Sequence, residues 1–212
     1  MANEAGGGPA VLGSKSRRRA ESDRRMLRAA IALVGQHGSV NASLAQIGLD
    51  AGYSRGLPAQ RYGTKLALLE AMIDAMEGWF DQLVAARTAG LHGAEALAAR
   101  IRTQMEAVRT TPGAAIALYH LIVDSTGAAP ELRPRIARLH AGYRRNIRGY
   151  LLEAQERGEL REDVDLDQTV RTILATISGC CLQALIDNDT ERLARDADFV
   201  ADLLVKRIAR TG

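Results

Sequence analysis

Aliphatic residues recur every three or four positions along most of this sequence, and short segments containing Gly or Pro separate the periodic stretches. This spacing places apolar side chains on one face of a helix. Hydrophobic residues make up 47% of the chain but aromatic residues only 4%, so Ala, Leu, Ile and Val supply most of the apolar surface. Alternating patterns bounded by hairpin turns are hard to find. The sequence therefore predicts an all-α fold.

The breaks between periodic stretches predict three short helices followed by about six longer ones. A first apolar stripe begins at Met26 and stops near Gly38, which suits a helix terminus. Short helices are expected from Ser43 and from Ser54 or Arg55, and a long helix begins at Lys65. Later helices are expected over residues 94–109, 114–124, 131–156, 166–186 and 191–209.

The N-terminal third of the chain is basic. Residues 1–65 hold ten Lys/Arg and four Asp/Glu, a net charge of +6, whereas the remainder holds 18 basic and 21 acidic residues, a net charge of −3. Such an asymmetry is typical of a module that faces a polyanion. Charge alone does not distinguish DNA from RNA or from an acidic protein surface.

Residues 1–20 are predicted to be a disordered basic tail. A Gly-rich start with Pro9 cannot form a core, and a cluster of cations follows it at Lys15, Arg17, Arg18 and Arg19. Two interpretations stay open for this cluster. It is either a solvated charge run or an arm that contacts phosphates or a minor groove.

Residues 43–65 read SLAQIGLDAGYSRGLPAQRYGTK and predict two short helices around a tight turn at Gly52. Two short helices around a Gly turn, preceded by a bracing helix, form the helix-turn-helix arrangement. The second helix of such a pair presents its N-terminal half to a major groove. Gln suits adenine and Arg suits guanine, so Gln60 and Arg61 are candidate base-reading residues.

Residues 24–72 resemble the DNA-binding domain of the TetR/AcrR family. The resemblance rests on a basic helix, then G-x-x-x-x-S-L-x-x-I, A-G-Y-S-R-G, an aromatic residue with G-T-K, and L-x-L-L. The residues that fit the family pattern are Gly52, Ser54, Arg55, Gly56, Tyr62, Lys65, Leu68 and Leu69. Leu57-Pro58-Ala59 departs from it, because the family often has Thr-Leu-Tyr there. A tyrosine-to-phosphate contact is therefore not available at Ala59, and base reading moves toward Gln60 and Arg61.

The resemblance implies a ligand-responsive transcriptional regulator. In this interpretation residues 21–66 are a helix-turn-helix DNA-binding domain, and residues 67–212 are a helical ligand-binding and dimerisation domain. The implied protein is a cytoplasmic repressor that binds double-stranded operator DNA as a homodimer and is released by a small apolar or amphipathic effector. The residues expected at the DNA are Ser43, Ser54, Arg55, Gly56, Gln60, Arg61 and, as a phosphate clamp, Lys65.

The body holds two further predicted sites. The middle helices carry aromatic and polar-apolar residues that are candidates for a pocket lining, although each of them also suits ordinary packing: Trp79, Met105, Tyr119, His120 and Tyr143. The last two predicted helices carry apolar seams that, in TetR-like proteins, pair with a second copy: Val170, Ile173, Ile177, Cys181, Val200 and Leu204. In a monomer the same seams would be core.

Other functional classes have little support in the sequence. There is no Gly-rich phosphate loop, nucleophile elbow or H-E-x-x-H motif, so neither an enzyme, nor a metal site, nor a cofactor is predicted. No apolar run approaches the roughly 18 residues of a membrane span. The adjacent Cys180 and Cys181 suit small buried thiols. A helical adaptor whose basic head docks an acidic partner is the remaining alternative.

Overall fold

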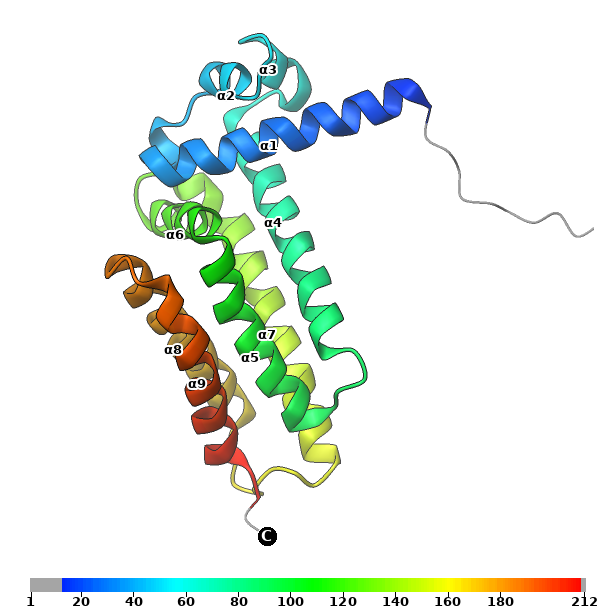
Figure 1. Cartoon of the computed structure of the whole chain (residues 1–212), viewed down its shortest axis with the longest axis vertical. Coiled ribbons are helices and arrows are strands. Elements are labelled where there is room, and N and C mark those ends of the chain that lie inside the picture. Colours follow the sequence, from blue (N-terminus) through cyan, green and yellow to red (C-terminus); the bar gives the residue numbers. More distant parts are fainter. Residues whose placement is uncertain (1–12, 211–212) are drawn as a thin grey trace, which may run out of the picture.

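The computed structural model describes residues 13–210, and over that range the chain is helical and has no β-strand (Figure 1). An isolated β-bridge joins Leu160 to Ala209. The predicted all-α fold is confirmed. In chain order the elements are α1 (Ser14–Asn41), α2 (Leu44–Asp50), α3 (Leu57–Tyr62), α4 (Lys65–Thr88), α5 (Gly93–Thr110), α6 (Pro112–Thr126), the 3-10 turn η1 (Pro130–Leu132), α7 (Arg133–Glu156), α8 (Leu166–Ile186), the 3-10 turn η2 (Thr190–Arg192) and α9 (Leu193–Ile208).

Helix α1 begins earlier than the sequence analysis expects. Residues 14–20, assigned there to a disordered tail, form its first turns, so the basic cluster at Lys15 and Arg17–Arg19 lies on a helix. No Gly or Pro interrupts residues 14–34, and Glu21 forms ion pairs with Arg24 and Arg25 along the exposed side. Residues 1–12 of the predicted tail lie outside the described residues.

Short polar side chains set the starts of the helices near the predicted turn. Ser43 accepts a hydrogen bond from the Gln46 backbone N–H at 3.1 Å, and Thr64 accepts one from Ala67, also at 3.1 Å. These contacts satisfy backbone donors that have no partner inside their own helix. Helix α3 begins at Leu57 rather than at Ser54 or Arg55, with Pro58 in its first turn, where a missing N–H does not weaken the helix.

The elements form a head and a body (Figure 1). Helix α1 lies across one end of the molecule with α2 and α3 beyond it, and it packs closely on α6. Helices α4, α5 and α7 run side by side away from this end. Helices α8 and α9 cover the other side of α5 and α7. We call α1–α3 the head and the remaining helices the body.

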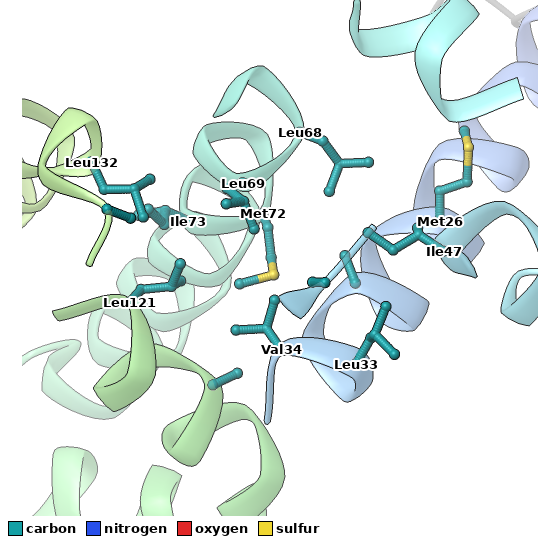
Figure 2. Packing of buried hydrophobic residues seen from close by; sticks show 14 of the residues in the cluster. Met26, Leu33, Val34, Ile47, Leu68, Leu69, Met72, Ile73, Leu121 and Leu132 are labelled. Carbon is teal, nitrogen blue, oxygen red and sulfur yellow. The ribbon is translucent and has the colours of Figure 1, made fainter. Parts of the chain in front are cut away.

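Two large hydrophobic clusters hold this arrangement together. The upper cluster joins head and body, and Figure 2 shows side chains from both of them meeting. Its labelled members are Met26, Leu33 and Val34 (α1), Ile47 (α2), Leu68, Leu69, Met72 and Ile73 (α4), Leu121 (α6) and Leu132 (η1). The lower cluster lies within the body alone. Its buried members include Leu97, Ile101, Met105, Ile147, Leu151, Ile173, Ile177 and Leu193.

Candidate nucleic-acid interface and internal cavities

The turn between α2 and α3 is built on two glycines. Gly52 has a φ of +79°, a conformation that side chains rarely adopt. Gly48, inside α2, lies so close to the next segment that an added Cβ would stand 2.5 Å from the Ser54 carbonyl oxygen. The Tyr53 backbone N–H also donates to the Gly48 carbonyl at 2.8 Å. Only glycine at position 48 lets the two helices approach this closely.

Most of the predicted DNA-contacting residues lie on the outside of this helix pair. Ser43, Ser54, Arg55, Gly56 and Gln60 are all exposed. They come from the start of α2, from the turn and from α3. The Ser43 hydroxyl also caps α2, so this residue fixes the helix as well as facing outward.

Arg61 is placed differently from the prediction. Its guanidinium donates to the Asp23 carboxylate at 2.7 Å and to the Ser22 hydroxyl at 3.3 Å, and its side chain is only 19% exposed. Because α3 begins at Leu57, Arg61 falls on the side of the helix that faces α1. This arginine braces α3 against α1 instead of extending toward a groove. Of the predicted base-reading pair, only Gln60 has its side chain exposed.

Lys65 and Tyr62 also connect elements of the head. The Lys65 ammonium donates to the Val40 backbone carbonyl at 2.7 Å, which links the start of α4 to the end of α1. An ammonium group has three donors, so this contact leaves Lys65 able to bind a phosphate as well. Tyr62 is half-buried, and burial raises the pKa of its phenol, with Asp23 adding to the effect. Tyr62 is thus a packing residue that joins the core between head and body.

An apolar cavity of about 620 Å³ lies between the head and the body. Three of the five predicted pocket residues line it, namely Trp79, Tyr119 and Tyr143. Other apolar walls come from Leu27, Ile31, Met76, Phe80, Val108, Leu118, Ile122 and Leu174. These residues belong to α1, α4, α5, α6, α7 and α8. The cavity is therefore in contact with the first helix of the head.

Two predicted pocket residues do not line this cavity. Met105 is fully buried in the lower cluster, because its face of α5 packs on the other helices of the body. His120 lies on the side of α6 near Gly38, its Nδ1 3.7 Å from where a Cβ on that glycine would stand. Both assignments are corrected by the structure, since the cavity faces a different side of each helix.

The polar groups in the cavity wall include a tyrosine, a histidine and two arginines. Tyr119 donates to the Ser178 carbonyl at 3.0 Å, and burial raises the pKa of its phenol. His140 Nε2 is buried and has no hydrogen-bond partner among residues 13–210. Burial, with a smaller effect from Arg144, lowers the pKa of this imidazole, which favours its neutral form. Arg24 and Arg28, both exposed, supply cationic groups from α1.

The predicted dimer seams lie inside the chain. Val170, Ile173, Ile177, Cys181 and Val200 are buried in the lower cluster, and Leu204 is half-buried against it. These residues form the core of the body, which was the other interpretation of the pattern. The exposed apolar residues of α8 and α9 are instead Leu182, Ile186, Phe199 and Leu203, with 42%, 72%, 69% and 53% of their surface accessible. We call these four the terminal patch.

Helix α8 is rich in apolar residues. Contrary to the sequence analysis, it is long and apolar enough, by length and composition, to cross a membrane. Only 28% of that stretch is buried within the described part of the chain.

Several residues of these sites were not predicted from the sequence. The role of Gly48 could have been suspected from the sequence, because a glycine within a helix is unfavourable and can mark close packing. Arg24 and Arg28 were counted only as part of the basic helix, and nothing local reveals that α1 borders a cavity. His140 stands three positions before Tyr143 on α7, which is a helical spacing that could have suggested a shared face.

A family model described as the C-terminal domain of tetracyclin repressor-like proteins matches residues 90–200, more than half of the chain. The chain belongs to the TetR family. It is therefore a ligand-responsive transcriptional regulator, and the proteins that it is similar to are regulators rather than enzymes. No curated protein sequence matches it.

Solved structures share the fold at low sequence identity. A TetR regulator from Chloroflexus aurantiacus aligns over 92% of this chain and 100% of its own, with a TM-score of 0.80 and 22% identity. FadR from Bacillus subtilis, in complex with stearoyl-CoA, aligns over 87% and 98%, with a TM-score of 0.77 and 22% identity. The complex of SmeT, a Stenotrophomonas maltophilia repressor, with triclosan aligns over 90% and 93%, with a TM-score of 0.75 and 19% identity.

Proposed function

We propose that this protein is a cytoplasmic repressor that binds a palindromic operator as a homodimer and leaves it when a small apolar or amphipathic molecule fills the cavity. The observation that carries the proposal is the 620 Å³ apolar cavity, whose walls include both α1 and α4. Helix α1 is the bracing helix of the head, and α4 begins directly after α3. An occupant of the cavity therefore touches two elements that position the DNA-reading surface.

The head is proposed to read DNA through the exposed surface of α2, the turn and α3. Gln60 is the candidate for base reading, while Ser43, Ser54, Arg55, Gly56 and Lys65 are candidates for phosphate contacts. Gln60→Ala should relax sequence preference at one position of each half-site, at a cost of about 1–3 kcal/mol. Arg55→Ala should weaken binding to all sequences and reduce its salt dependence. Binding assays with randomised operators distinguish the two effects, and unchanged preference in Gln60→Ala would remove the assignment.

A second copy of the chain is proposed to cover the terminal patch. One short recognition helix reads only a few base pairs, so specific binding requires two heads about one helical turn apart. The patch spans two helices that pack on each other, and its four large apolar side chains are otherwise left in water. Phe199→Glu should therefore yield monomers in sedimentation experiments. Val123→Glu is the matched control, because Val123 is 66% exposed on α6, outside the patch.

Release from DNA is proposed to follow from a two-state equilibrium. A ligand that binds better to the conformation with a displaced α4 changes the separation of the two heads and weakens operator affinity. The cavity volume falls within the usual range for small-molecule sites, about 300–1,000 Å³. Triclosan and stearoyl-CoA, which SmeT and Bacillus subtilis FadR bind, are suitable first probes.

The decisive experiment measures operator release by such probes in two variants. Leu174→Trp fills the cavity and should abolish the response, since Leu174 lines it. Leu152→Trp adds the same bulk at an exposed position of α7 and should respond normally. If no compound that enters the cavity changes operator affinity, the effector part of the proposal fails while DNA binding stands.

A further inference from the structure

Arg100 is a buried cation without a buried anionic partner. Its side chain is 1% exposed, in the middle of α5, and its guanidinium lies 4.6 Å from the centre of the Phe80 ring and 5.8 Å from that of Tyr143. Nε donates to the Asn146 amide oxygen and Nη1 to that of Gln104, both at 2.9 Å. Burial lowers the pKa of Arg100 to about 10, which leaves it charged at neutral pH.

The remaining nitrogen, Nη2, is buried and has no hydrogen-bond partner among the described residues. Leaving a buried charged donor unsatisfied is costly, and neutral amides compensate only part of the charge. Nε and Nη2 lie on the same edge of the planar guanidinium, and such an edge matches the two oxygens of a carboxylate. On this edge Nη2 has no partner among the described residues, and Nε is bound to Asn146, an exposed residue.

The same arginine forms part of the wall of a second cavity. This polar cavity of about 560 Å³ lies between α4, α5 and α7 and is distinct from the apolar one, although Tyr143 borders both. Its charged wall residues are Glu77, Asp81, Arg100 and Arg145. Glu77 is paired with Arg135 at 2.5 Å, so Asp81 is the acidic group that opposes the two cations.

We propose that the polar cavity binds the carboxylate of a small organic acid, which takes Nε and Nη2 of Arg100 and displaces the Asn146 amide. A single negative charge suits the site better than a phosphate, because Glu77 and Asp81 also line the cavity. Tyr143 and Tyr150 offer apolar ring surface for the rest of the acid. This site does not depend on the proposed operator or on the effector of the apolar cavity.

The test is calorimetric titration of the full-length protein with benzoate and with benzamide, its uncharged counterpart. Benzoate should bind and benzamide should not. Arg100→Met should weaken benzoate binding roughly tenfold or more, the loss expected for a charge-assisted pair of hydrogen bonds. Arg102→Met is the matched control, because Arg102 lies on the same helix but pairs with Asp198 and Asp202 outside the cavity. It should leave binding unchanged.

Asn146→Ala gives a result that a merely structural role of Arg100 would not produce. It removes the amide that competes for Nε, so benzoate should bind several-fold more tightly. If Arg100→Met does not fold, the benzoate and benzamide pair together with Asn146→Ala still decides the question. Equal binding of acid and amide, equal binding of inorganic phosphate, or unchanged benzoate affinity in Arg100→Met would each overturn the proposal.

Discussion

The upper and lower hydrophobic clusters differ in what they connect. The lower cluster closes the body on itself, with α5, α7, α8 and α9 contributing to it. The upper cluster draws on head and body together, from Met26 and Ile47 to Leu121 and Leu139. The head therefore has no separate core of its own. Its position over the body is set by packing between the two regions.

The largest expected effect is on operator affinity, which should fall after a substitution in the upper cluster but not after one in the lower cluster. Leu121→Ala in the upper cluster and Ile177→Ala in the lower one should each cost about 2–5 kcal/mol of folding free energy, since both side chains are fully buried. At a temperature where both variants remain folded, only Leu121→Ala should weaken operator binding. Denaturant unfolding and gel shifts measure the two quantities, and equal operator affinities would show that the clusters are functionally alike.

A polar contact reinforces the upper connection. The Asp124 carboxylate on α6 accepts hydrogen bonds from the Ser39 backbone N–H at 3.0 Å and from its hydroxyl at 2.5 Å, and Ser39 is fully buried. Asp124→Ala should cost about 1.5–3 kcal/mol, because it leaves the buried Ser39 donors without this acceptor. The control is Asp198→Ala, which breaks an exposed ion pair worth less than about 1 kcal/mol. Thermal unfolding compares the two, and equal losses would argue against a role for the Asp124 contact.

One glycine in the head and one in the body can each be replaced by alanine, which compares the two regions through the same substitution. Gly48→Ala should destabilise the head by about 1–3 kcal/mol, because its Cβ meets the Ser54 backbone, and it should disrupt operator binding. Gly93→Ala should have a similar cost in the body, because Gly93 has a φ of +50° and its Cβ would meet the Glu159 carboxylate. Operator affinity of the folded fraction should be normal in Gly93→Ala. Loss of operator binding in both variants would contradict the assignment of operator contacts to the head alone.

The smallest expected effect is a pH dependence that arises from one carboxylate of the body. A hydrogen bond from the Ala94 backbone N–H, and next Arg157, lower the pKa of Glu159 below its usual 4.5. A lowered pKa in the folded state stabilises the protein above about pH 4.5, and this contribution disappears as the pH falls through the folded-state value. Glu159→Gln should therefore be slightly less stable than the parent at pH 7 and equal to it in strong acid. Unfolding at a series of pH values tests this.

Features of the fold and of the candidate sites could be predicted from the sequence where neighbouring residues determine them, and could not where residues on another helix do. The helices were predictable because the three-to-four spacing and the breaks lie within short stretches, and the turn was predictable because Gly52 marks it. The role of Arg61 was not, since it depends on Asp23, which lies on another helix. The seam through Val170 and Ile177 could not distinguish core from interface, because both require the same apolar spacing. The exposed apolar residues of the same two helices, such as Ile186 and Phe199, were not singled out.

The apolar cavity has α1 as one of its walls, through Arg24, Leu27, Arg28 and Ile31. The same helix carries Asp23, which holds Arg61 of α3 in place. Under the proposed function, ligand preference and DNA affinity are therefore encoded partly in the same stretch of sequence and cannot diverge independently there. An engineer who wishes to change the ligand while keeping the operator should vary the far walls, at Val108 on α5 or Leu174 on α8, and leave α1 untouched.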